Sequence, residues 1–300
     1  MCFRYLCNEK FNSLRISHYI TLAIAIALIA LLYWGGNTVP PLKQPVADMQ
    51  RPSSGGAVSQ VSNIVKTASF DSIITESKKQ LPKAVADTVN TIENELAAMR
   101  DSSRMASVLL SLSDLWQRNN ILPLAAYYKG KAGKLENSEK NLTFAAQLFL
   151  QLMENERSAS MQKWEAIEAA GCLEQSLQIN PNNEDTKLAL ATSYIEGTGE
   201  PMKGVQILLA ITREKPEDVP ANMLLGKMSI QSGQFDKAVV RFETILKKEP
   251  ANTEAMYFLA QAYEGKGDKQ KAIELLEKCK RIVNKPEFSR DIDQHINLLK

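Results

Sequence analysis

The sequence predicts an all-α protein with one N-terminal transmembrane helix and repeated helical hairpins behind it. Residues 19–35 form an apolar run without a charge. From about residue 61 onward, apolar residues recur at spacings of three and four, and no stretch follows the two-residue period of a strand. Four prolines, Pro181, Pro216, Pro250 and Pro286, follow one another at intervals of about 35 residues.

Composition is that of a folded chain and gives no electrostatic case for nucleic-acid binding. The 300 residues are 44% hydrophobic and 23% charged, and the net charge is +2. Basic and acidic side chains are interspersed, without a basic stripe. We therefore expect no nucleic-acid partner.

The apolar run of residues 19–35 has the features of a membrane anchor. It is just long enough for the hydrocarbon core of a bilayer, and Tyr19 and Trp34 stand at its ends, where aromatic residues favour the interface. Arg4, Lys10 and Arg15 precede it, so residues 1–18 are expected in the cytoplasm. We predict a single-pass protein of the inner membrane, with the rest of the chain on the periplasmic side.

Two other interpretations of this run stay open, a cleaved signal peptide and a buried soluble helix. Cleavage needs small residues before the cut, whereas Tyr33 and Trp34 occupy the end of the run. The retained anchor is the interpretation we favour. Residues 36–60, rich in Pro, Gly and Ser, follow as a flexible linker.

The C-terminal half repeats one pattern three times. Between successive prolines of residues 182–286 lie two apolar-periodic segments and one Gly-centred turn. This 34-residue helix–turn–helix resembles the tetratricopeptide repeat. The middle copy matches best, with Gly226 where paired helices cross, Gly233 in the turn, Ala238 opening the second helix and Phe242 as its aromatic residue. The first copy carries Thr198 as a one-residue insertion.

The resemblance sets the expected domain organisation. Repeats occupy residues 139–286, with a turn near 157–160 in the first of them, and a capping helix covers 287–300. Residues 61–138 form an N-terminal helical region with one degenerate copy of unfixed register. The family fold implied is a right-handed superhelical solenoid, in which each hairpin buries its apolar face against the next.

No motif of an enzyme, cofactor site or metal site occurs in the sequence. The two histidines, His18 and His295, are far apart in the chain, and no Gly-rich phosphate loop or nucleophile motif is present. Cys172 and Cys279 stand at helical positions, where small apolar residues fit. We predict no catalytic activity, no cofactor, no metal and no small-molecule substrate.

The resemblance implies instead a concave groove that binds other proteins or peptides. In the family, defined positions of each first helix line this groove. They fall here on Leu188, Thr192 and Ile195, on Met223, Lys227 and Ile230, and on Tyr257, Gln261 and Glu264.

The predicted function is therefore a membrane-tethered scaffold or adaptor. Two alternatives stay open. One is an assembly or maturation factor of a membrane or periplasmic complex, such as those of cytochrome c maturation. The other is a non-catalytic subunit of an enzyme or sensor complex. The identity of the partner would distinguish them.

Overall fold

The computed structural model describes residues 66–300, which belong to one compact unit, Asn63–Lys300. The predicted cytoplasmic segment, membrane anchor and linker, residues 1–60, lie outside the described residues. Within residues 66–300, none of the helices has the length and apolar character needed to cross a membrane.

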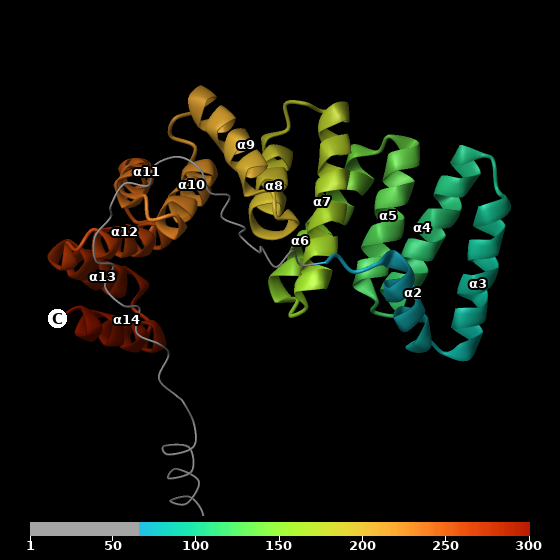
Figure 1. Ribbon diagram of the computed structural model, residues 1–300, viewed down its shortest axis with the longest axis horizontal. Helices are drawn as coiled ribbons and strands as arrows, with labels where there is room; N and C mark the ends of the chain where they lie inside the picture. The colour runs from blue at the N-terminus through green and yellow to red at the C-terminus, as the bar shows by residue number, and fades with distance from the viewer. Residues whose placement is uncertain (1–65) are drawn as a thin grey trace, which may run out of the picture. The chain divides into compact units, whose positions relative to one another are not determined.

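The described chain is helical throughout and contains no strand, which confirms the all-α prediction (Figure 1). Its elements in order are α2 Phe70–Lys79, α3 Lys83–Ala98, α4 Ser102–Arg118, α5 Leu122–Glu136, α6 Glu139–Asn155, α7 Ala159–Ile179, α8 Glu184–Ser193, the π-helical turn η1 Tyr194–Thr198, α9 Pro201–Glu214, α10 Val219–Gln231, α11 Phe235–Lys248, α12 Thr253–Gly265, α13 Lys269–Val283 and α14 Pro286–Leu299.

From α4 onward, consecutive helices pack as antiparallel hairpins, α4/α5, α6/α7, α8/α9, α10/α11 and α12/α13 (Figure 1). Helix α14 packs on α13 at the end of the array. The degenerate copy of the N-terminal region is the α4/α5 hairpin, whose register the sequence left open. The turn between α6 and α7 is shorter than expected, because α7 begins at Ala159.

Short polar signals in the sequence begin and end these helices. Asp218 and Asn252 are the N-caps of α10 and α12, and each side chain accepts the backbone N–H three residues on. The hairpin turns contain Gly233 and Gly267 in the left-handed region, with φ of 71° and 81°. A side chain disfavours that conformation, so glycine allows the second helix to begin at once.

The insertion at Thr198 is accommodated within the helix that carries it. Helix α8 continues into η1, five residues of π-helix, and ends at Gly199 with φ of 83°. A π-helical turn absorbs one extra residue without breaking the helix. Gly197, inside this turn, lies against α7: a Cβ there would be 2.2 Å from that of Ala166.

The core is a series of apolar clusters, each shared by neighbouring hairpins. The first runs from Ile73 to Tyr194, and the next three join α8 to α10, α10 to α12, and α12 to α14. Because consecutive clusters meet on one helix, each hairpin stabilises the next. Cys172 and Cys279 are buried free thiols, and burial raises the pKa of each to about 11.

The N-terminal helices α2 and α3 extend the array beyond the first hairpin. The Phe70 ring of α2 stacks on Tyr127 of α5, with centroids 4.2 Å apart, and the Ala68 N–H donates to the Ser160 carbonyl at 3.0 Å. Helix α2 is therefore anchored to residues that follow it by more than 50 positions.

Candidate protein-binding face

The first helices of successive hairpins, α6, α8, α10 and α12, contact one another and form one side of the array (Figure 1). The nine predicted groove residues all lie on α8 with η1, on α10 and on α12. We call this side the first-helix face. Most of these side chains are half-buried, so part of each is accessible to a partner.

The residues of the first copy are mainly packing residues with partial exposure. Leu188 and Ile195 are half-buried against the cluster that joins α8 to α10. Thr192 is also half-buried, and its hydroxyl donates to the Leu188 carbonyl at 3.1 Å. This part of the face offers a shallow apolar surface.

Lys227 is the polar centre of the face. Its ammonium group lies 2.6 Å from the Glu254 carboxylate of the next first helix and 4.7 Å from the centroid of the Phe258 ring. Burial raises the pKa of Glu196 of η1, an effect that Lys227 opposes and Glu154 reinforces. Lys227 thus interacts with carboxylates of both α12 and η1, an arrangement that the sequence did not reveal.

The third copy connects the face to the capping helix. Tyr257 is half-buried, and its ring meets Phe258 and His295 edge-on at centroid distances of 5.7 and 6.3 Å. Glu264 contacts His295 Nε2 at 3.0 Å, and the half-buried Gln261 lies between Tyr257 and Glu264 in the chain of α12. His295 joins Tyr257 and Glu264 because α14 brings it next to α12. Its position in the sequence gave no indication of these contacts.

Met223 differs from the other predicted groove residues because it is buried. It is only 8% exposed and lies in the apolar cluster with Val239 and Phe242, while Ile230 is half-buried against the same cluster. Helix α10 is apolar around most of its circumference, so residue type does not distinguish its inner side from its outer side. Met223 therefore packs mainly in the core and offers little exposed area on the face.

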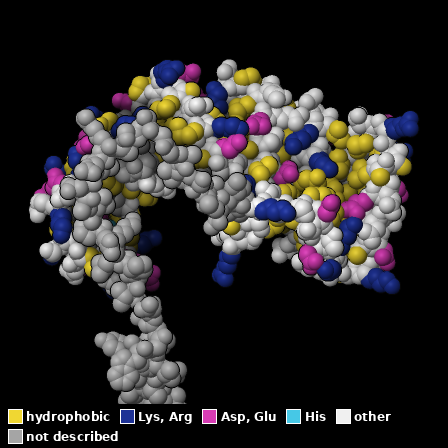
Figure 2. All heavy atoms as spheres, viewed as in Figure 1, with side chains coloured by type: hydrophobic (Ala, Val, Ile, Leu, Met, Phe, Trp, Pro, Cys, Tyr) yellow, Lys and Arg dark blue, Asp and Glu magenta, His cyan; other side chains and the backbone are white. Residues whose placement is uncertain are grey.

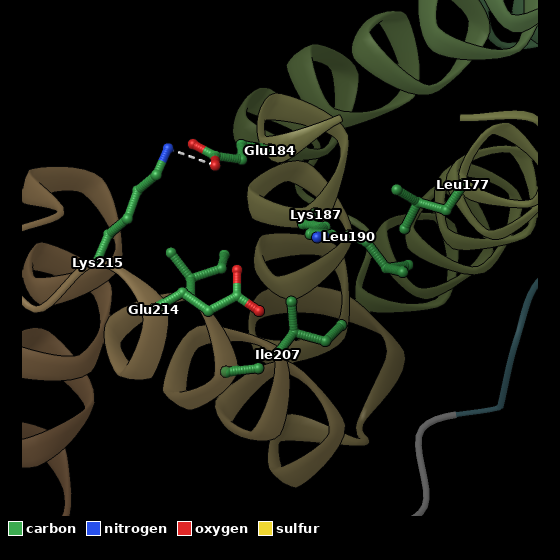
Figure 3. A pocket seen from close by; sticks show the side chains of 9 residues that line it. Leu177, Glu184, Lys187, Leu190, Ile207, Glu214 and Lys215 are labelled. Atoms are coloured by element: carbon green, nitrogen blue, oxygen red, sulfur yellow. Dashed lines mark hydrogen bonds and ion pairs between the residues drawn. The ribbon is translucent and has the colours of Figure 1, made fainter. Parts of the chain in front are cut away.

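A pocket between α7, α8 and α9 is a separate feature (Figure 3). Its volume is about 270 Å³, below the roughly 300–1,000 Å³ of typical small-molecule sites. Leu177, Leu190 and Ile207 line it, and the ion pair of Lys215 with Glu184, 2.5 Å apart, stands at one side. At this side of the pocket, the positive charge of Lys215 is therefore neutralised by Glu184.

A larger apolar pocket, about 630 Å³, lies among α2, α3, α4 and α5. Figure 2 shows hydrophobic side chains gathered over this part of the molecule. Glu93 at its wall is engaged by Lys78 at 2.5 Å and by the Tyr128 hydroxyl at 2.9 Å. Burial, with Glu93 nearby, raises the pKa of Tyr128, so Tyr128 is a neutral hydrogen-bond donor in the folded chain.

Comparison with known families agrees with the hairpin geometry. Residues 229–289 match the family model described as the tetratricopeptide repeat. This part of the chain carries the tetratricopeptide repeat. The match covers the second helix of one hairpin, the whole of the next and the start of α14, where the sequence pattern is most regular.

Known relatives of this chain share only part of their length with it. Cellulose synthase operon protein C of Komagataeibacter sucrofermentans and that of Komagataeibacter xylinus are each 29% identical over 118 residues. That stretch is 39% of this chain and 9% of each relative. The chain therefore spans a small fraction of these relatives.

Solved structures similar to this chain include YrrB, a TPR protein described as having an unusual peptide-binding site. YrrB is 19% identical, with a TM-score of 0.45, and covers 71% of this chain and 98% of its own. MamA is 16% identical, with a TM-score of 0.47, over 59% of this chain and 91% of its own. PilW, a type IV pilus biogenesis factor, is 18% identical, with a TM-score of 0.45. The similarity covers 60% of this chain and 78% of PilW.

Proposed function

We propose that this chain is a membrane-tethered scaffold that binds partner proteins or peptides through the first-helix face. The observation that carries the proposal is the group formed by Lys227, Phe258 and Tyr257 on adjoining first helices. In this group a lysine lies over an aromatic ring, and a half-buried tyrosine stands beside them. Together they offer a partner apolar surface with polar ends, and aromatic residues are enriched at protein interfaces.

The geometry favours a particular kind of ligand. A segment of a partner protein that crosses several hairpins fits the face better than a small molecule does. Residues of the face come from three consecutive first helices, and each contributes two or three side chains that are at least partly exposed. Lys227 is already paired with Glu254. A charged group of the partner would therefore either replace one member of this ion pair or join it. A partner segment with its own charged group could make that exchange while covering Tyr257.

Removing Tyr257 and Lys227 together should abolish partner capture. Tyr257→Ala with Lys227→Ala removes the aromatic anchor and the cation, and a central anchor typically contributes about 2 kcal/mol or more to binding. The full chain should be used as bait in detergent-solubilised membranes, with captured proteins identified by mass spectrometry. The identity of the partner would also separate a scaffold from an assembly factor or a non-catalytic subunit.

Tyr263→Ala is the matched control, because Tyr263 is also on α12 but bonds to Glu243 of α11, 3.0 Å away. It should leave capture unchanged. If the double variant and the control retain the same partners, the first-helix face is not the binding surface. Circular dichroism should show that all variants stay helical.

We also propose that residues 19–35 tether the array on the extracytoplasmic side of the inner membrane. The support is the charge bias of Arg4, Lys10 and Arg15 before the apolar run. A reporter that fluoresces only in the cytoplasm should stay dark when fused after Lys300 and should fluoresce when fused before Met1. The opposite result would reverse the proposed topology.

A further inference from the structure

A second groove lies on the other helices of the array, between α9 and α11, with α10 as its floor. Its volume is about 750 Å³. We call it the second-helix groove. The residues that line it and carry the argument below are Met202, Val205, Leu209, Lys237, Val240 and Arg241.

The walls of the second-helix groove expose large apolar side chains. Met202 is 65% exposed, Val240 62% and Leu209 41%. Met202, Val205 and Leu209 follow the three- and four-residue spacing of one helix side, so α9 presents an apolar ridge to the groove. Apolar residues gathered in this way usually mark an interaction surface.

Close packing on the opposite side of α9 leaves this ridge uncovered. Gly204 lies against α8: a Cβ there would be 2.5 Å from the Ala191 carbonyl oxygen. Helix α9 therefore packs closely on α8, the first helix of its own hairpin. Met202 and Leu209 stay exposed on the side that lines the groove, and Val205 between them is half-buried against the cluster that joins α8 to α10.

Two cations line the groove without a carboxylate partner in the described part of the chain, while Asp236, the one acidic residue of its lining, is paired with Lys266. Among the described residues, Arg241 has one hydrogen-bond partner, the neutral Asn222 side chain, at 3.0 Å, and forms no ion pair. Burial lowers the pKa of Arg241. Lys237 contacts the neutral Gln234 at 2.6 Å, and Asp236 is engaged by Lys266 at 2.6 Å.

We propose that the second-helix groove binds an amphipathic helix of a partner protein that carries acidic residues beside its apolar side. The ridge from Met202 to Leu209 spans about 10 Å, two turns of helix at roughly 1.5 Å per residue. Such a helix would pack its apolar side on the ridge and on Val240. Its carboxylate would form the ion pair that Arg241 lacks, since a guanidinium binds a carboxylate in a bidentate manner.

The test uses a defined probe. A fluorescein-labelled 14-residue peptide of Leu, Ala and Glu, with leucines on one helical side, is titrated with the full chain in lipid nanodiscs. Binding is followed by fluorescence anisotropy. A peptide with Lys in place of every Glu is the charge control, and both peptides are blocked at their ends.

The Glu peptide should bind and the Lys peptide should not. Arg241→Gln should weaken binding roughly 10-fold or more, because a hydrogen bond to a charged group contributes about that much. Val240→Glu should abolish it, whereas Ile282→Glu, at an exposed apolar position of α13, should have no effect. Because Val240 and Ile282 are both exposed, neither change disturbs the core.

Three results would overturn the proposal. They are no binding of the Glu peptide, equal binding of both peptides, or unchanged binding to Arg241→Gln and Val240→Glu. Sedimentation of the chain alone adds a fourth: a dimer that Val240→Glu dissociates would make the groove a self-association surface. Tyr257→Ala with Lys227→Ala should leave peptide binding intact, which separates this groove from the first-helix face.

Discussion

Gly226→Leu should strongly destabilise the array. A Cβ at Gly226 would lie 2.5 Å from Cζ of Phe242. Phe242 is fully buried and stacks on Phe258, with centroids 5.8 Å apart, so the ring has no room to move. Overpacking of this kind costs about 1–3 kcal/mol, and a leucine adds three further carbons.

The free energy of unfolding of residues 63–300 can be measured by urea denaturation followed by circular dichroism. Gly171→Ala is the matched control, because Gly171 is also inside a helix but the nearest atom to its added Cβ is 3.6 Å away. We expect the control to be neutral or slightly stabilising, since alanine favours a helix over glycine. Equal stability of Gly226→Leu and wild type would show that α10 and α11 do not pack as described.

Damage from Gly226→Leu should also spread along the array. The cluster containing Phe242 meets the clusters on either side at α10 and α12. In a stack of repeats, stability depends on the interfaces between neighbours. Hydrogen exchange should therefore report faster opening in α8 and α13 as well as in α10.

The hairpins of residues 182–286 could be predicted from sequence because their signals are local. Proline at the end of a second helix and glycine in the turn act within a few residues, and Gly233 and Gly267 adopt the positive φ that such turns require. Gly226 could be placed for a similar reason, since only a very small residue fits where paired helices cross. These positions are set by backbone geometry, which the residue type reveals directly.

The details of the candidate site depend on contacts between distant residues, and they could not be predicted in the same way. Met223 and Tyr257 occupy the same repeat position, yet only Met223 is buried in the core. The ion pair of Lys227 with Glu254 joins residues 27 positions apart. His295 reaches Tyr257 only through the placement of α14 on α13.

Burial of Glu165 is the least predictable of these features. Its helix, α7, mixes small, large apolar and charged residues and has no single apolar side. Glu165 is 1% exposed, and its Oε2 has no hydrogen-bond partner among the described residues. The neighbouring Ala166 is covered by Gly197 of η1, the turn that contains the inserted residue. The turn that contains the inserted Thr198, in the α8/α9 hairpin, thus packs beside the buried carboxyl group of Glu165 in the α6/α7 hairpin.

This buried carboxyl group should make the stability of the array depend on pH. Burial, with a smaller contribution from Glu156, raises the pKa of Glu165 from its ordinary 4.5 to about 7. Below pH 4.5 the folded and unfolded chains both hold the proton. Between about pH 4.5 and 7 only the folded chain holds it, so the free energy of unfolding falls as the pH rises. Above pH 7 neither form holds it, and this dependence ends.

Glu165→Gln should remove this loss because the amide never ionises. Wild type should lose roughly 3 kcal/mol relative to the variant between pH 4.5 and 7, since each pKa unit corresponds to about 1.4 kcal/mol. Urea denaturation of both proteins from pH 4.5 to 8 measures the difference, and Glu165→Leu, which also lacks an ionisable group, should follow the Gln variant. Parallel curves for wild type and both variants would mean that Glu165 is not buried as the packing of η1 on α7 requires.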